Sequence, residues 1–222
     1  HLAVAHPVHQ GKFSDALLAG LPLRSDVATA CVASASNWGT ARTAAKLRLG
    51  FPADVPLVFI MGGSQGSLAI NAVVAESVST FNHKGISVLH SVGKLNALPP
   101  SQGGYKPVAY VDAMADAYLA ADVIIARSGA VTCAEVNTLG RYALFIPLPI
   151  GNGEQNLNAA SLISQGRAEI IPQAQFTTEW ITANLSRLLA RSNAAPITGS
   201  TIDIEATTKI VALMDYALSG GK

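Results

Sequence analysis

Residues 57–67 read LVFIMGGSQGS, and this stretch decides the fold class. Five apolar residues lead directly into a glycine-rich turn, and the helical pattern that follows has Ile70, Val73 and Val74 on one face. A continuous apolar run of this length is typical of a strand that is buried on both faces of a parallel sheet. The stretch therefore predicts a strand, a tight turn and a helix in direct succession.

The same alternation continues along the chain as far as Pro172. We predict strands near 57–61, 86–90, 107–110, 122–126, 143–147 and 168–171, and helices over 67–80, 112–120, 130–139, 154–165 and 177–191. Short apolar runs that alternate with longer helical patterns indicate a parallel sheet with helices on its faces. The prediction is an α/β fold, a Rossmann-like doubly wound parallel sheet.

The flanking segments differ from this alternation. A helix over 40–49 precedes the first strand, and another over 202–218 ends the chain. Residues 1–7 have a strand-like pattern, an irregular segment follows, and residues 18–23 are predicted to be extended. The chain begins with His1 rather than methionine, so we expect a piece of a longer polypeptide.

The composition excludes several classes of protein. Half of the 222 residues are hydrophobic and 13% are charged, which excludes a disordered chain. The net charge of +1, without blocks of like charge, argues against a nucleic-acid surface. No apolar run approaches the roughly 20 residues of a transmembrane helix, and a signal-peptide pattern is missing. Two cysteines, Cys31 and Cys133, favour a reducing, cytosolic setting.

Residues 62–67, GGSQGS, form the first candidate site. Glycines let the backbone turn sharply and approach a ligand, while free amides at a helix N-terminus favour phosphate. The spacing is not that of the dinucleotide-binding fingerprint, which makes a dehydrogenase a weaker hypothesis. The alternative is a tight turn that serves packing alone.

Residues 127–135, RSGAVTCAE, form the second candidate site between a predicted strand and a helix. Ser128 and Thr132 are suited to cap the helix, and Glu135 lies near its start, so a purely structural reading stays open. However, this helix and the first one begin at the same carboxyl edge of the sheet, where open α/β folds bind ligands. Two such N-termini would hold one diphosphate and leave Glu135 to accept hydrogen bonds from ribose hydroxyls.

Residues 151–159, GNGEQNLNA, form the third candidate site. Glu154 and Asn158 share one face of the helix start, with Gln155 beside them. Carboxylates and amides clustered in this way suit the hydroxyls of a sugar, whereas the alternative is a solvated capping turn. The five histidines lack metal-ligand spacing and an Asp-x-Asp motif is missing, so neither a metal nor another cofactor is expected.

The three motifs, in this order, resemble the C-terminal domain of the MurG family of N-acetylglucosaminyltransferases, glycosyltransferase family 28. The resemblance covers about residues 1–218 and rests on VFIMGGSQGS, AYVDAMADAYLAADVIIARSGAVTCAE and PLPIGNGEQNLNA. It implies the C-terminal half of a GT-B fold, with residues 1–36 as the end of an acceptor domain plus a linker. Residues 37–222 would then be the domain that binds UDP-N-acetylglucosamine.

The resemblance also implies an activity and a location. Family members are hexosyltransferases that invert the sugar linkage as they transfer N-acetylglucosamine to undecaprenyl-diphospho-muramoylpentapeptide, converting lipid I to lipid II in peptidoglycan synthesis. They are peripheral enzymes at the cytoplasmic side of the bacterial membrane. The lipid acceptor and the catalytic base belong to the N-terminal half of the family, so we expect both outside this chain. The alternative is an epimerase-like or non-catalytic module that binds UDP-sugars.

Matched residue by residue, the resemblance implies specific donor contacts. Ser64 would contact the diphosphate, and the backbone of Val111 would read the uracil edge. Glu154 stands where many relatives have glutamine or histidine, which leaves its contact with the sugar open. The implied donor-binding residues are Arg24, Gly63, Ser64, Gln65, Gly66, Val111, Ser128, Gly129, Ala130, Val131, Thr132, Cys133, Ala134, Glu135, Glu154, Gln155 and Asn158.

Overall fold

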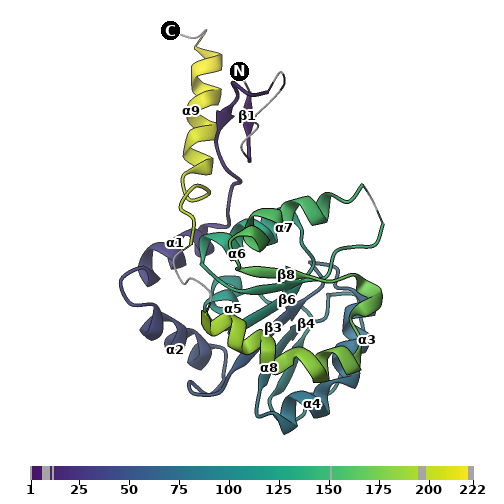
Figure 1. Ribbon diagram of the computed structural model, residues 1–222. Helices are drawn as coiled ribbons and strands as arrows, with labels where there is room; N and C mark the ends of the chain where they lie inside the picture. The colour runs from purple at the N-terminus through teal and green to yellow at the C-terminus, as the bar shows by residue number, and fades with distance from the viewer. Residues whose placement is uncertain (1, 7–10, 12, 151, 195–198, 220–222) are drawn as a thin grey trace.

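A six-stranded parallel sheet forms the centre of the protein (Figure 1). The computed structural model describes the whole chain except residues 1, 7–10, 12, 151, 195–198 and 220–222. The strands are β3 (Leu57–Met61), β4 (Ser87–Ser91), β5 (Tyr105–Val108), β6 (Val123–Ala126), β7 (Ala143–Phe145) and β8 (Ala168–Ile170). Their order is β5-β4-β3-β6-β7-β8, and each neighbouring pair is parallel. This is the predicted doubly wound sheet: successive strands are added in one direction from β3 to β5 and in the other from β6 to β8, so the strand order reverses between β3 and β6.

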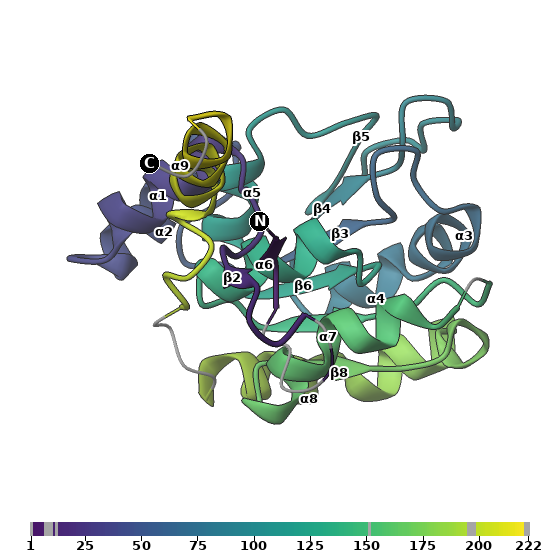
Figure 2. The same cartoon turned by 90° about the horizontal axis from the view of Figure 1, so that it is seen from above.

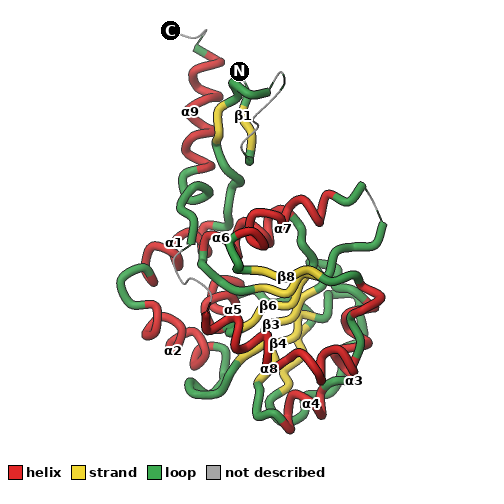
Figure 3. The backbone as a smooth tube through the Cα atoms, viewed as in Figure 1, coloured by secondary structure: helices red, strands yellow, loops and turns green. Residues whose placement is uncertain are grey.

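Helices cover both faces of the sheet (Figure 3). Every residue of β3, β4, β6 and β7 is buried, so alternate side chains of each strand enter opposite cores. In β3, Leu57 and Phe59 enter one core, whereas Val58 and Ile60 enter the other. The first core is covered by α1 (Ser25–Ser34), α2 (Trp38–Arg48), α5 (Met114–Ala120), α6 (Ala130–Thr138) and α7 (Glu154–Ser164); the second is covered by α3 (Leu68–Glu76), α4 (Val78–His83) and α8 (Thr178–Ala194).

Two helices differ from the sequence-based prediction. The helix expected over 67–80 is broken at Ser77, whose hydroxyl donates to the carbonyl of Val73 at 2.7 Å. This bond competes with the regular helical pattern and explains why α3 and α4 are separate. Helix α1 was not predicted, since its sequence SDVATACVAS carries a weak apolar stripe, yet Val27 is fully buried in the first core.

Two segments from opposite parts of the chain, the β1–β2 pair and α9, lie together, away from the six-stranded sheet (Figures 1 and 2). Strand β1 (Ala3–Val4) pairs in parallel with β2 (Leu17–Leu18), and α9 (Ala206–Leu218) stands beside them. The backbone N–H of Leu21 donates to the carboxylate of Asp203 at 2.7 Å and joins the two segments. Helix α9 has exposed apolar side chains at Val211, Met214, Tyr216 and Leu218. Among the described residues, no helix is both long and apolar enough to cross a membrane.

His90 lies in β4 and is fully buried between polar neighbours. Its Nδ1 is 2.8 Å from the hydroxyl of Tyr105, and its Nε2 is 3.1 Å from Oδ1 of Asn71. Burial lowers the pKa of His90 to about 4, and burial raises the pKa of Tyr105 to about 12. Both side chains are therefore neutral in the folded protein near pH 7.

We expect the stability of the protein to fall as the pH drops from about 6.5 to about 4. The unfolded chain binds a proton at His90 below its ordinary pKa of 6.5, whereas the folded chain binds it only near pH 4. Above pH 6.5 this difference in proton binding adds its full amount, about 3 kcal/mol, to the free energy of unfolding. Most of that stabilisation is lost by pH 4. Urea unfolding of the wild type and His90→Gln at pH 7 and pH 4.5 measures it. Equal pH dependence of the two proteins would contradict it.

Candidate functional site

A cavity of about 610 Å³ lies at the carboxyl edge of the sheet, where the strand order reverses. It opens between the loop after β3 and the start of α6, which is the usual ligand position in open α/β sheets. Its lining includes Gly62, Gly63, Ser64, Gln65, Gly66, Ser67, Arg127, Gly129, Thr132, Leu148 and Gln155. The structure thus brings residues of all three sequence motifs to one site.

The GGSQGS loop turns tightly from β3 into α3. The backbone N–H of Gly66 donates to the carbonyl of Gly63 at 3.0 Å, and both glycines have positive φ angles. Ser67 is the N-cap of α3, and its hydroxyl accepts the N–H of Ile70 at 3.5 Å. The first amides of α3 consequently point towards the cavity with the positive end of the helix dipole.

Helix α6 begins at the same cavity. Gly129 is its N-cap, and among the described residues the first N–H of the helix with a hydrogen-bond partner is that of Cys133, which donates to the Gly129 carbonyl. The amides of Ala130, Val131 and Thr132 precede this bond and are therefore available to an anion. The capping role predicted for Ser128 and Thr132 is wrong, because Thr132 lies inside the first turn and the buried Ser128 hydroxyl has no hydrogen-bond partner among the described residues.

Arg127 opens the second sequence motif, but the sequence assigned it no role and it was not among the implied donor-binding residues. Its Nη1 donates to the carbonyls of Ile146 and Pro147, both at 2.9 Å, and its Nη2 donates to Ser67 Oγ at 2.8 Å and Gln173 Oε1 at 2.6 Å. The guanidinium therefore ties the start of α3 to the segments after β7 and β8. An arginine at the end of a fully apolar strand was the available signal, since a buried charge requires several partners.

Glu135 lies beside Arg24, and neither residue lines the cavity. Its side chain is 1% exposed, its Oε2 accepts the hydroxyl of Tyr118 at 2.8 Å, and Arg24 Nε is 3.5 Å from its Oε1. Burial raises the pKa of Glu135, while Tyr118 and Arg24 oppose that shift. Oε1 accepts no hydrogen bond within the described part of the chain, although such an atom usually has a donor.

The polar side chains of the third motif bind backbone groups, and one of them also lines the cavity. Gln155 lines the cavity, and its Oε1 accepts the N–H of Leu148 at 3.0 Å. Asn158 donates to the carbonyl of Ser128 at 3.1 Å, so it joins α7 to the start of α6. Glu154 Oε2 accepts the N–H of Asn152 at 3.1 Å, a contact within the turn that precedes the N-cap Gly153. Glu154 and Asn158 therefore have backbone partners in this structure.

The remaining predicted residues differ in what they offer a ligand. Val111 follows β5 and has a buried side chain, and no hydrogen bond in the described part of the chain involves its backbone N–H or C=O. A free backbone pair is what reading a base edge requires. Cys133 and Ala134 have buried side chains that pack in the core, and burial raises the pKa of the Cys133 thiol to about 12.

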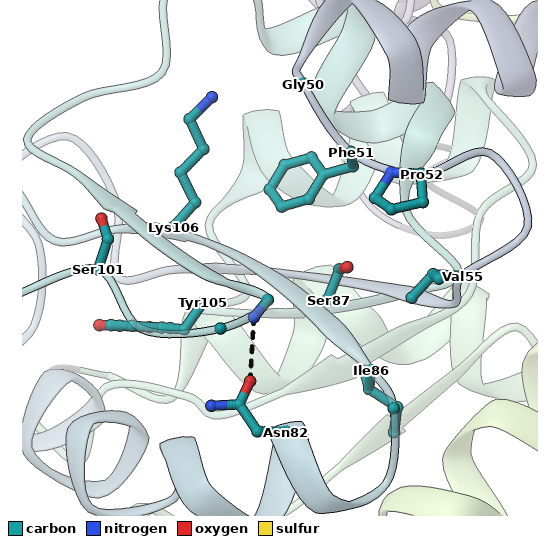
Figure 4. Close-up of a pocket in the computed structure, with 13 residues that line it drawn as sticks. Gly50, Phe51, Pro52, Val55, Asn82, Ile86, Ser87, Ser101, Tyr105 and Lys106 are labelled. Atoms are coloured by element: carbon teal, nitrogen blue, oxygen red, sulfur yellow. Dashed lines mark hydrogen bonds between the residues drawn. The ribbon is translucent and has the colours of Figure 1, made fainter.

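A second cavity, of about 620 Å³, lies near the opposite edge of the sheet (Figure 4). Its lining is mainly apolar and glycine-rich, with Phe51, Pro52 and Val55 on one side. Its lysine, Lys106, donates to the carbonyl of Leu49 at 2.8 Å. The carboxamide oxygen of Asn82 accepts the N–H of Gly104 at 3.1 Å (Figure 4). These polar groups are already paired, so the cavity at the carboxyl edge is the better candidate for a polar ligand.

Within the described residues, no cluster of three or more His, Cys, Asp or Glu side chains could hold a metal ion.

The fold and the site define the class as a doubly wound α/β domain whose ligand cavity lies at the switch point of the sheet. Residues 57–212 match the model of the glycosyltransferase family 28 C-terminal domain. The chain belongs to this family, which confirms the resemblance drawn from the three motifs.

Proteins named as N-acetylglucosamine transferases are similar to much of the chain. The UDP-N-acetylglucosamine--N-acetylmuramyl-(pentapeptide) pyrophosphoryl-undecaprenol N-acetylglucosamine transferase of Corynebacterium efficiens is 42% identical over 166 residues, covering 75% of this chain and 44% of that protein. The transferase of the same name from Streptomyces coelicolor is 37% identical over 194 residues, covering 85% and 51%. The chain therefore spans about half the length of the curated relatives it matches.

The crystal structure of Acinetobacter baumannii MurG has the same fold. It superposes with a TM-score of 0.65 at 23% identity, over 96% of this chain and 59% of that one. The predicted architecture, the C-terminal half of a GT-B fold, is confirmed by this similarity.

Proposed function

We propose that this chain is the donor-binding part of an inverting transferase that uses UDP-N-acetylglucosamine. The acceptor is undecaprenyl-diphospho-muramoylpentapeptide, which becomes lipid II. The observation that carries the proposal is the cavity at the switch point, where the N-termini of α3 and α6 meet in a family 28 chain. Two helix N-termini around one cavity suit a ligand with two linked phosphates.

The proposed chemistry separates the sugar from UDP. As the bond to the anomeric carbon breaks, that carbon gains oxocarbenium character and negative charge develops on the departing diphosphate. The amides at the starts of α3 and α6 stabilise that charge, and the Ser64 hydroxyl donates a hydrogen bond to it. The helices hold these amides in place before the reaction, so the amides need little rearrangement as the charge develops.

Three further residues complete the proposed donor site. The free backbone of Val111 reads the uracil edge, and Gln155 lies where the sugar hydroxyls would be. Oε1 of Glu135, which has no hydrogen-bond donor among the described residues, accepts from the ribose. Because Arg24 now lies 3.5 Å from that oxygen, ribose binding requires the Arg24 side chain to move aside.

The proposal assigns the acceptor side of the reaction to sequence outside this chain. The lipid acceptor and the catalytic base belong there, and the complete enzyme acts peripherally at the cytoplasmic side of the membrane. We propose that β1, β2 and α9 form the junction with that acceptor domain, since they stand together apart from the main sheet. Because α1 packs in the first core, we place the start of the donor domain before Ser25 rather than after residue 36.

Titration calorimetry with UDP and UDP-N-acetylglucosamine tests the proposed function. We expect both to bind, and we expect Glu135→Gln to raise the Kd of UDP by about 10- to 100-fold, the range for hydrogen bonds to a charged group. Glutamine retains an acceptor for the Tyr118 hydroxyl, so the fold should survive. The exposed Glu179 on α8 provides the control variant Glu179→Gln, which should bind normally.

A deoxyribose ligand makes the test specific for the ribose contact. If Glu135 accepts from the ribose, 2′-deoxy-UDP should bind the wild type more weakly than UDP does, and Glu135→Gln should reduce that difference. The proposal fails if the wild type binds neither nucleotide. The role of Glu135 fails if Glu135→Gln leaves the Kd of UDP unchanged.

A further inference from the structure

The loop after β4 is in backbone contact with the GGSQGS loop. A Cβ atom on Gly66 would lie 1.9 Å from the carbonyl oxygen of Val92, and one on Gly93 would lie 2.2 Å from that of Gln65. Both glycines have positive φ angles, 76° and 103°. The two loops therefore approach more closely than residues with side chains allow.

Asn96 joins these two loops through its side chain. Its Nδ2 donates to the carbonyl of Gln65 at 2.9 Å and to the carbonyl of Val92 at 2.8 Å. Its own backbone N–H donates to the carbonyl of Gly93 at 3.1 Å, which keeps the side chain over the contact. Ser64 and Gln65, by contrast, are exposed and have no side-chain hydrogen bond to other described residues. Asn96 is thus the side chain that holds the exposed tip of the GGSQGS loop.

The hydrogen bonds continue from this contact into the core. Asn71, on α3, donates from its Nδ2 to the carbonyl of Val92 at 2.8 Å, so this carbonyl accepts from both asparagines. Since the nitrogen of the Asn71 amide is the donor, its oxygen must accept from His90 Nε2. His90 Nδ1 then carries no proton and accepts the hydroxyl of Tyr105. Each hydrogen bond in the chain from Tyr105 to Gln65 consequently has an assigned donor and an assigned acceptor.

We propose that Asn96, Asn71 and His90 are positioning residues that hold the GGSQGS loop in the geometry that receives a diphosphate. The inference rests on the proposed function for the identity of the ligand, whereas the restraint on the loop stands on the hydrogen bonds themselves. A loop held in its binding conformation loses less conformational entropy when it binds. His90 and Asn71 act through Val92 and Asn96 and do not touch the ligand.

Amide hydrogen exchange of the loop tests the restraint without any ligand. The reporter is the N–H of Gly66, which is hydrogen-bonded to Gly63. We expect Asn96→Ala and His90→Leu to speed its exchange by about tenfold, because each removes hydrogen bonds that oppose local opening. His90→Gln should restore slow exchange, since the glutamine amide can donate to Asn71 in place of Nε2.

Asn82→Ala is the matched control for Asn96→Ala. Asn82 also makes two hydrogen bonds to loop backbone, one to Gln102 and one to Gly104, at the cavity shown in Figure 4. Its loss should leave exchange at Gly66 unchanged. The proposal is overturned if exchange at Gly66 is as slow in Asn96→Ala and His90→Leu as in Asn82→Ala. If His90→Leu fails to fold, Asn96→Ala decides alone, because Asn96 lies outside the core.

Binding measurements connect the restraint to the diphosphate. We expect the Kd of UDP to rise about tenfold in Asn96→Ala, while the Kd of uridine, which lacks phosphate, stays within about twofold. An equal rise in the Kd of UDP and in the Kd of uridine would overturn the proposal that the loop is held for the diphosphate. If the wild-type chain binds neither ligand, the proposed function fails, and the exchange experiment still decides whether these residues hold the loop.

Discussion

Alanine at position 66 is expected to remove UDP binding and to lower the free energy of unfolding by about 3 kcal/mol. Gly66 has a φ of 76°, and the added Cβ would lie 1.9 Å from the backbone carbonyl of Val92. Backbone atoms cannot swing away as a flexible side chain can, so the loop after β4 or the GGSQGS loop must shift. Urea unfolding and UDP calorimetry measure the two effects.

Alanine substitutions at two other glycines of the site distinguish the two causes of the lost stability, which are backbone strain and the close contact between the loops. Gly63 has a φ of 92° but nothing within 4 Å of an added Cβ, so Gly63→Ala should cost only the conformational strain, about 1–2 kcal/mol. Gly129 has an ordinary φ of −65° and open space for a Cβ, so Gly129→Ala should cost only the poorer N-cap, about 1 kcal/mol or less. Equal losses at the three positions would contradict the close approach of the two loops.

The replacement Arg127→Met is expected to lower the free energy of unfolding by about 3 kcal/mol and to weaken UDP binding by at least about tenfold. Methionine fills much of the space of arginine but leaves the carbonyls of Ile146 and Pro147 without their donor. It also releases Ser67, the N-cap of α3, from the guanidinium. The amides of α3 would then lose their fixed direction towards the cavity.

Lysine and a distant arginine provide the controls for Arg127. Arg127→Lys retains the charge but not the planar fork that reaches four acceptors, so we expect it to recover only part of the loss. Arg187, which pairs with Glu169 through a partly exposed side chain, is the matched site. Arg187→Met should cost about 1 kcal/mol or less and leave UDP binding intact. A small effect of Arg127→Met on both measurements would show that the guanidinium does not organise the site.

The sheet and the place of the site could be predicted from the sequence because both depend on local patterns. The apolar run 57–61 is β3 with the predicted bounds, and the runs near 122–126 and 143–147 correspond to β6 and β7. Such runs are buried on both faces whatever their neighbours are, since helices cover both sides of a parallel sheet. The motifs after β3 and β6 met at one edge because parallel strands end on the same side.

Other features depend on contacts between residues far apart in the sequence, so local patterns do not reveal them. Glu135 reads as a residue near a helix start, yet Tyr118 and Arg24 surround it in the fold. Helix α1 has few large apolar residues, and its place follows from the packing of Val27 in the first core. Asn96 looks like an ordinary loop residue until the backbone of Gln65 lies beside it.

The sequence by itself determined the doubly wound α/β class, the family, and which strand ends carry the site, because periodicity and motif order are properties of the chain. The tertiary structure alone decided which polar groups are free and which are already paired. It assigned Arg127 to four acceptors, linked His90 through Asn71 to the loop after β4, and left Glu135 Oε1 without a hydrogen-bond donor among the described residues. The physical reason is that a hydrogen bond depends on distance and direction in space, which separation along the chain does not specify.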